Sequence, residues 1–178
     1  MTKSIIIEMR FMKIAIISDT HDNLLNLRVF FNFAKKENIE TIVHCGDTAH
    51  SETLEEILKN FAGRIYLSFG NMDFLKEFAV FKNNERVQIF EEFGQIELSG
   101  LKIGFCHFPE LAMKNAEKCD FVFYGHTHKP WIEKIGNCFV ANPGNLAGQY
   151  YAPSFAILNT ETKNLSLIPF DKLQYDAK

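Results

Sequence analysis

The sequence predicts one α/β domain in which two mixed β-sheets pack face to face and helices cover both outer surfaces. Two patterns support this prediction. Apolar, β-branched stretches alternate with amphipathic segments through the first half of the chain, which is typical of a largely parallel sheet. The second half contains strand-like stretches separated by two-residue turns, which indicate hairpins. Two packed sheets account for this order of elements.

The first half is predicted to form a βαβαβ run. A helix is expected after Asp22 and Asn23, which are good helix caps, and another after Ser51. Apolar residues recur there at helical spacing, namely Leu27, Phe30, Phe31 and Ala34 in the first helix and Leu54, Ile57, Leu58 and Phe61 in the second. The strands predicted around them are residues 13–17, 41–45 and 64–69.

The second half is richer in strands. Ser99-Gly100 separates two strand-like stretches and Gly136-Asn137 separates two more, and both dipeptides suit hairpin turns. Pro109 is expected to open a helix that runs to residue 118, because proline is favourable in the first helical turn. The predicted strands are residues 95–98, 102–105, 121–124, 131–135, 138–140, 155–158 and 165–169.

Size and composition indicate an ordinary soluble domain. The chain has 178 residues, of which 47% are hydrophobic and 23% charged, and 18 phenylalanines predict a core rich in aromatic rings. We expect one domain over residues 12–170, a peripheral N-terminal extension over 1–11 and a C-terminal tail over 171–178. The net charge of −3 gives no broad cationic surface, so long nucleic acids are not expected as partners.

No membrane span or signal peptide is recognisable, so a cytoplasmic location without membrane association is expected. The four cysteines lack the CxxC spacing of a zinc site. They are interpreted as small core residues rather than disulfides or zinc ligands.

Five short runs of polar residues each follow a predicted strand. Ligands of open α/β sheets bind beyond the carboxyl ends of the strands, so these runs are expected to meet at one place. Their carboxylate, imidazole and amide groups are what a two-metal hydrolytic site needs. The runs are Asp19-Thr20-His21, Gly46-Asp47, Gly70-Asn71-Met72-Asp73, Cys106-His107 and Gly125-His126-Thr127-His128.

Each run alone is a weaker signal than the set. Asp19 and His21 are two apart, so in extended geometry both side chains would point to one side and hold one metal. Asp47 has two carboxylate oxygens that could bridge two cations, and Gly46 before it would let the backbone approach them closely. In isolation, however, Asp-x-His is better explained by a coil aspartate and a surface histidine, and Gly-Asp by a common turn.

The remaining candidates differ in strength. Asn71 would give one metal a neutral oxygen, or would simply be a turn residue. A lone His107 after a buried strand is more often a core side chain than a ligand. His126 and His128, on alternate positions of an extended segment, favour metal binding even in isolation, because two buried histidines need partners.

Two other histidines lie outside these runs. His44, on a predicted strand leading to Asp47, is expected to be structural or to hydrogen-bond to the site. His50 is expected to be a surface loop residue without a chemical role.

Together the ordered motifs resemble the calcineurin-like metallophosphoesterases, in particular the small subgroup of YfcE-type phosphodiesterases. The resemblance runs from Asp19 to His128 and continues loosely through Asn142-Pro143-Gly144. It implies a four-layer αββα sandwich and two divalent cations, with Mn²⁺ expected first and Fe, Zn²⁺, Co²⁺ or Ni²⁺ as alternatives. It also implies two ligand sets, which are Asp19, His21, Asp47 and His128 for one metal and Asp47, Asn71, His107 and His126 for the other.

The chain departs from the family at two positions. Relatives often carry His or Cys where this chain has Met72, and a His there protonates the leaving oxygen or contacts the phosphate. Phe108-Pro109 follows His107 where many relatives have Gly-His. Asp73 is retained and is expected to orient a ligand or water. A phosphodiester with a good leaving group is therefore the expected substrate, because general acid help, typically about 10²–10⁴-fold in rate, is missing.

The resulting hypothesis is a phosphodiesterase that hydrolyses small phosphate esters through a metal-bridging hydroxide. Its catalytic residues are expected to be Asp47, Asn71, Asp73 and His107. A nuclease or cyclic-nucleotide phosphodiesterase would use the same metals. The alternative from another class is a non-catalytic scaffold of the Vps29 type, which a conspicuous exposed apolar patch away from the site would favour. A homodimer is expected from small relatives.

The loops around the metals carry no substrate signature. Phe74, Phe78 and Phe81 could stack on a base or aryl group, but core positions are the better expectation.

Overall fold

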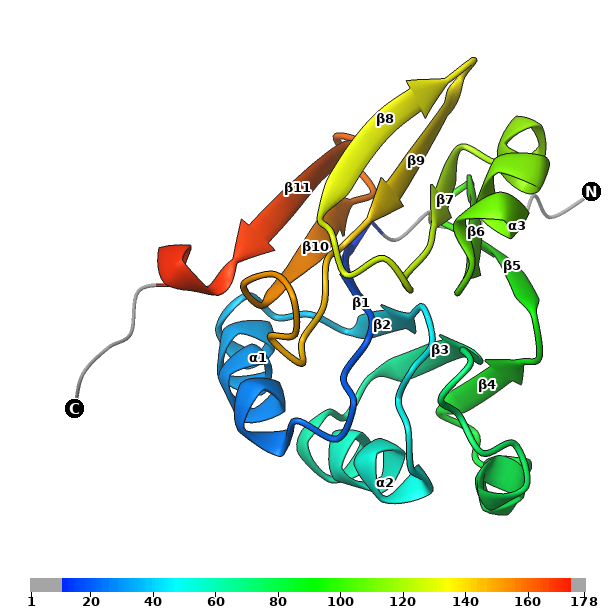
Figure 1. Ribbon diagram of the computed structural model, residues 1–178. Coiled ribbons are helices and arrows are strands. Elements are labelled where there is room, and N and C mark those ends of the chain that lie inside the picture. The colour runs from blue at the N-terminus through cyan, green and yellow to red at the C-terminus, as the bar shows by residue number, and fades with distance from the viewer. Residues whose placement is uncertain (1–10, 174–178) are drawn as a thin grey trace, which may run out of the picture.

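Two β-sheets lie face to face at the centre of the molecule, with helices on their outer surfaces (Figure 1). This computed structural model describes residues 11–173. The expected N-terminal extension, apart from Phe11, and the end of the expected tail beyond Leu173 lie outside the described residues. The four-layer αββα sandwich predicted from the sequence is confirmed.

The first sheet has six strands in the order β11-β10-β1-β2-β3-β4. The first four strands in the chain pair in parallel, and β10 and β11 join them antiparallel. The helices α1 (Leu24–Lys36) and α2 (Ser51–Asn60) connect β1 to β2 and β2 to β3, as predicted. The strands are β1 (Lys13–Ile17), β2 (Thr41–His44), β3 (Arg64–Ser68), β4 (Val87–Phe90), β10 (Ser154–Asn159) and β11 (Asn164–Pro169).

The second sheet has five strands in the order β5-β6-β7-β9-β8. Both predicted hairpins are confirmed, because β5 pairs with β6 and β8 with β9 across the expected two-residue turns. The helix α3 (Pro109–Asn115) begins at Pro109 and continues as the 3₁₀ turn η2 (Ala116–Lys118). The strands are β5 (Phe93–Leu98), β6 (Leu101–Cys106), β7 (Phe121–Phe123), β8 (Trp131–Ile135) and β9 (Cys138–Asn142).

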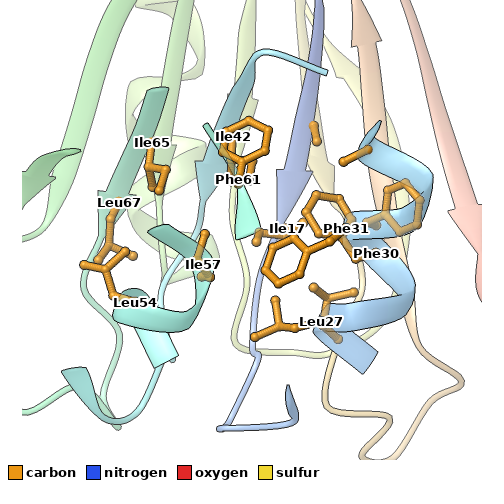
Figure 2. Close-up of a cluster of buried hydrophobic side chains, with 14 of the residues drawn as sticks. Ile17, Leu27, Phe30, Phe31, Ile42, Leu54, Ile57, Phe61, Ile65 and Leu67 are labelled. Carbon is orange, nitrogen blue, oxygen red and sulfur yellow. The ribbon is translucent and has the colours of Figure 1, made fainter. Parts of the chain in front are cut away.

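Strand β1 shows how the layers are held together. Ala15 and Ile17 face α1 and α2, whereas Ile14 and Ile16 face the second sheet, and all four are fully buried. Both faces of this strand are apolar because both are covered, as in sheets flanked by helices. Figure 2 shows the first of these layers, in which Ile17 lies beside side chains of α1 and α2.

The start of α1 is fixed by a side-chain cap. The carboxamide oxygen of Asn23 accepts a hydrogen bond from the backbone N–H of Asn26 at 3.0 Å. Such a cap contributes about 0.5–2 kcal/mol. Because Asn23 lies shortly after β1, it also fixes where the loop carrying Asp19 and His21 ends.

Three elements were not predicted. They are β4 and two 3₁₀ helices, η1 (Glu77–Phe81) and η3 (Phe170–Lys172). Phe78 and Phe81 of η1 are buried in the helix-side core, as expected, but Phe74 is exposed. The four cysteines are free thiols and are all buried. Among residues 11–173, no helix is long and apolar enough to cross a membrane.

Candidate metal centre

The five polar runs meet at one edge of the two sheets. The loops that follow β1 and β2 are joined by a hydrogen bond from Asp19 N to Gly46 O at 2.9 Å. The loops that follow β6 and β7 are joined by one from Gly125 N to His107 O at 3.0 Å. The seven predicted ligands lie together at this edge.

Three of them form one half of the site. His128 Nε2 lies 3.2 Å from Asp19 Oδ1 and 3.4 Å from His21 Nε2. His21 Nε2 lies 3.9 Å from the same Asp19 oxygen. These three groups are close enough to hold one metal ion.

Three others form the second half. Asn71 Oδ1 lies 3.0 Å from His107 Nε2 and 3.0 Å from His126 Nδ1. The two imidazole nitrogens are 3.2 Å apart. His107 is almost fully buried, whereas Asn71 and His126 are exposed, so this half is open to solvent on one side.

Asp47 lies between the two halves. Its Oδ2 is 3.6 Å from His21 Nε2 and 3.4 Å from His107 Nε2. Its Oδ1 accepts a hydrogen bond from the backbone N–H of Met72 at 2.8 Å. One carboxylate oxygen therefore faces both groups of ligands, while the other anchors it.

Hydrogen-bond acceptors face one another across the site, an arrangement that a bound cation would stabilise. His107 Nδ1 lies 2.9 Å from Cys45 O and therefore carries the proton it donates, which leaves a lone pair on Nε2. That lone pair faces the carbonyl oxygen of Asn71, which is also an acceptor. His128 Nδ1 lies 3.3 Å from Gln149 O, so its Nε2 likewise presents a lone pair to the carboxylate of Asp19. Imidazole nitrogens and carboxylate oxygens are suitable donors for divalent transition metals.

The same juxtaposition shifts the ionisation of the site. Burial alone would raise the pKa of Asp47, but His107 and the N–H of Met72 outweigh it and lower that pKa. Burial likewise opposes protonation of His107, yet Asp47 and Asp19 raise its pKa. The contact with Asp19 raises the pKa of His128. The carboxylates therefore favour positive charge here, which is what a cation site requires.

The backbone reaches this geometry differently from the prediction. Asp19 and His21 were expected to be extended, and so were His126 and His128. Instead all four have positive φ, at 51°, 39°, 67° and 59°, and so does Asp47 at 56°. Left-handed residues turn the chain sharply, so the side chains converge through tight turns rather than by strand alternation. Such conformations gather at functional sites.

Two glycines permit the close approach of the loops. A Cβ on Gly46 would lie 2.7 Å from His107 Nδ1, and a Cβ on Gly70 would lie 2.2 Å from Asp47 Oδ1. Gly46 was predicted to let the backbone approach the metals, and the structure shows that the space it leaves is filled by His107 and Gly70. Gly70 has the same role on the other side of Asp47.

The sequence matches the family model for a calcineurin-like phosphoesterase superfamily domain over residues 12–163. The chain belongs to this superfamily. The phosphodiesterase MJ0936 of Methanocaldococcus jannaschii is 36% identical over 162 residues, which cover 85% of this chain and 95% of the relative. The solved structure of an archaeal phosphodiesterase has a TM-score of 0.79 at 35% identity, covering 89% of this chain and 99% of that one.

More distant structures share the fold of this calcineurin-like domain. YfcE, a phosphoesterase from E. coli, has a TM-score of 0.65 at 20% identity, covering 89% of this chain and 100% of that one. Vps29 from Cryptosporidium parvum has a TM-score of 0.65 at 19% identity, covering 88% and 95%. The fold is therefore common to phosphoesterases and to Vps29.

Asp73 holds the backbone of the loops that carry Asp47 and Gly70. Its Oδ2 accepts hydrogen bonds from Asp47 N at 3.0 Å and Gly70 N at 2.7 Å, and its Oδ1 accepts one from Ala49 N at 2.9 Å. Burial raises the pKa of Asp73, although the three N–H groups act against it. This carboxylate therefore ties the loop after β3 to the loop carrying Asp47.

His44 is buried below the site. Its Nδ1 accepts a hydrogen bond from Gly46 N at 3.2 Å, so Nε2 is the protonated nitrogen that faces Thr20 Oγ1 at 3.3 Å. Burial lowers the pKa of His44 to about 4. A neutral histidine here links the loop after β2 to the loop after β1, as its sequence position suggested.

His50 is exposed and contributes only to the surrounding loops. Its Nδ1 lies 2.7 Å from Asp22 Oδ2, and its ring stacks on Phe74 at a centroid distance of 5.3 Å. It lies at the N-cap of α2 but makes no capping hydrogen bond with its side chain.

Two buried asparagines, whose roles were not predicted, fix the loop that carries His126 and His128. Asn142 Nδ2 donates to Gly125 O at 2.8 Å and Thr127 Oγ1 at 3.0 Å, and Asn145 Nδ2 donates to His128 O at 3.3 Å. The polar Asn-Pro-Gly-Asn run directly after an apolar strand was the available signal, because buried amides need partners.

Proposed function

We propose that this chain is a phosphodiesterase that works with two divalent metal ions. Asp19, His21, Asp47 and His128 would hold one ion, and Asp47, Asn71, His107 and His126 the other. When bound, such ions acidify the water that attacks phosphorus and neutralise charge on the phosphoryl oxygens. The observation that carries the proposal is Asp47 Oδ2, which lies 3.6 Å from His21 and 3.4 Å from His107.

The ligand set also balances charge. Only two carboxylates serve the two ions, and Asn71 adds an oxygen without adding negative charge. Mn²⁺ is the first expectation for both positions, with Fe, Zn²⁺, Co²⁺ and Ni²⁺ as competitors for these nitrogen and oxygen donors. Asp73 would act as a positioning residue for Asp47, because its oxygens already accept three backbone hydrogen bonds.

A preference for diesters is supported by the side chains at the open side of the site. Met72 is 46% exposed and has no proton to give a leaving alcohol. The ring of Phe108 lies 4.9 Å from that of His126, and the next residue, Pro109, stands where many relatives carry a histidine. The named relative MJ0936 is itself a phosphodiesterase, which agrees with this preference.

The proposal also covers the extent of the domain, the substrate, the location and the oligomeric state. The catalytic unit would be residues 12–170, acting on a small phosphate ester in the cytoplasm and forming a homodimer. Light scattering during size-exclusion chromatography tests the dimer without reference to activity.

The decisive experiment compares wild type with Asp47→Asn. We expect wild type to bind two metal ions per chain and to hydrolyse bis-nitrophenyl phosphate faster than nitrophenyl phosphate in the presence of Mn²⁺. The variant should lose metal and activity together, whereas the exposed control Asp171→Asn should keep both. Faster cleavage of the monoester would contradict the diester preference.

A scaffold of the Vps29 type is the second candidate. Phe74, Leu75 and Val80 are exposed apolar residues on and beside η1, and the Vps29 fold is similar. Against it, folding alone does not require seven ligand side chains to converge. A protein that binds two metals in the experiment above but cleaves neither ester would support the scaffold instead.

A further inference from the structure

A cavity opens beside the candidate metal centre. It has a volume of about 350 Å³ and lies between the loop after β3, the β4–β5 turn and the start of α3. Its size falls in the lower range of small-molecule sites, which is about 300–1,000 Å³. It is therefore large enough for one arm of a small diester.

This cavity shares walls with the metal centre. Phe108 lines the cavity, and its ring lies 5.0 Å from that of His107 and 4.9 Å from that of His126. Gly70 also lines the cavity, and it lies directly against Asp47 of the metal centre. A phosphate held between the two halves of the centre would therefore have one substituent next to this cavity.

The lining of the cavity has a distinct chemistry. Leu75, Phe108 and Leu111 supply apolar and aromatic surface. Glu91 and Glu92 supply two exposed carboxylates, and Asp73 supplies a third that already accepts three backbone hydrogen bonds. Among the described residues that line it, none is lysine, arginine or histidine. Within residues 11–173, neither glutamate forms an ion pair with another side chain.

We propose that this cavity binds the alcohol arm of the diester and selects arms that carry an alkylammonium group, a selection that rests on the proposed phosphodiesterase function. The aromatic face of Phe108 and the two glutamate carboxylates both attract a weakly hydrated cation, and the leucines contact its alkyl groups. An anionic arm would meet three carboxylates, and no lysine, arginine or histidine side chain among the described lining residues would offset them. Glu91 and Glu92 would thus determine specificity without taking part in the cleavage.

The test uses two diesters that differ by one charge. Nitrophenyl phosphorylcholine is compared with its neutral isostere, in which a tert-butyl group replaces the trimethylammonium group, and nitrophenolate release is followed for both. We expect wild type to have the higher kcat/KM for the choline ester, mainly through KM. The double variant Glu91→Gln with Glu92→Gln should lose about threefold or more of that preference, because exposed charge pairs contribute about 0.2–1 kcal/mol each.

A matched control removes two charges elsewhere. Glu55→Gln with Glu161→Gln changes the net charge equally at exposed residues that do not line the cavity, and should keep the wild-type preference. An equal loss of preference in the control would overturn the proposal, since the effect would then be one of total charge. A third variant, Leu75→Ala, should reduce kcat/KM for both bulky esters relative to the methyl nitrophenyl diester.

The outcomes separate the two levels of inference. If no diester is cleaved with any of the metals, the phosphodiesterase proposal fails and the assignment of the cavity falls with it. If wild type and the Glu91/Glu92 variant cleave both esters in the same ratio, the phosphodiesterase proposal stands and only the cavity assignment is wrong.

Discussion

Replacing Asp73 by asparagine removes one acceptor from a carboxylate that serves three backbone N–H groups. The amide keeps one oxygen, and the better orientation leaves it where it accepts from Asp47 N and Gly70 N. The amide NH₂ then faces the N–H of Ala49, so one donor loses its partner and meets another donor. Leaving a buried polar group unsatisfied costs about 1–3 kcal/mol. We expect Asp73→Asn to lower the free energy of unfolding by that amount.

Activity should fall less in Asp73→Asn than in Asp73→Ala, which also releases the backbone of Asp47. A misplacement of about 1 Å in a catalytic group can cost about 10²-fold in rate. Urea unfolding and kcat/KM for bis-nitrophenyl phosphate measure the two effects. Asp120→Asn is the control, because among residues 11–173 the Asp120 side chain accepts a single backbone hydrogen bond, from Lys102 N at 2.8 Å, which an amide oxygen retains. Unchanged stability of Asp73→Asn would refute the three-acceptor reasoning.

Three further predictions concern single residues. Gly70→Ala should weaken metal binding in calorimetry and lower kcat/KM about tenfold or more, because its Cβ would lie 2.2 Å from Asp47 Oδ1; wild-type affinity would contradict this. Burial lowers the pKa of His44 to about 4, from about 6.5 for a histidine in water. The neutral imidazole therefore contributes fully to stability above about pH 6.5. The free energy of unfolding should fall by about 3 kcal/mol as the pH is lowered from about 6.5 to about 4. Denaturant unfolding of His44→Gln over the same pH range should show a smaller fall. Met72→His should raise the ratio of monoester to diester turnover at least about tenfold by supplying a proton donor, and an unchanged ratio would show that the site lacks more than this donor.

The convergence of the site was predictable from the sequence because it depends on strand direction. Asp19, Asp47 and His107 each follow a strand that the apolar pattern reveals, and the carboxyl ends of parallel neighbours lie at one edge. The hairpin turns were predictable for a local reason, because a two-residue hairpin turn favours residues that adopt positive φ. Ser99 and Gly100 both adopt positive φ in the structure. These features follow from short-range pattern and a general rule of topology.

Other features depend on contacts that no local pattern encodes. Strand β4 is short and only partly buried, so its residues lack the apolar run that identified its neighbours. The three hydrogen bonds of Asp73 come from two different loops, and the left-handed turns at the ligands are set by the loops that meet there. Asparagine and aspartate tolerate such turns, but histidine at positive φ is uncommon and gives no sequence signal.

The site in its metal-free form should be an energetic liability for the fold. Five predicted ligands adopt left-handed conformations, each of which costs on the order of 1 kcal/mol, and acceptor atoms face one another across about 3 Å. Cations would relieve the second of these costs, so metal binding should be coupled to folding.

Removal of the metal with a chelator should therefore lower the melting temperature, and a metal concentration of about 100 times Kd should restore about 2.7 kcal/mol. Calorimetry of Asp47→Asn with and without chelator separates the stabilisation by bound metal from the stability of the metal-free fold. The variant should show little response to metal because it lacks the shared carboxylate. Its metal-free stability should be lower than that of metal-free wild type, because the lowered pKa of Asp47 means that the ionised carboxylate stabilises the fold at neutral pH. A variant that responds to metal as wild type does would show that Asp47 is not shared between the two halves.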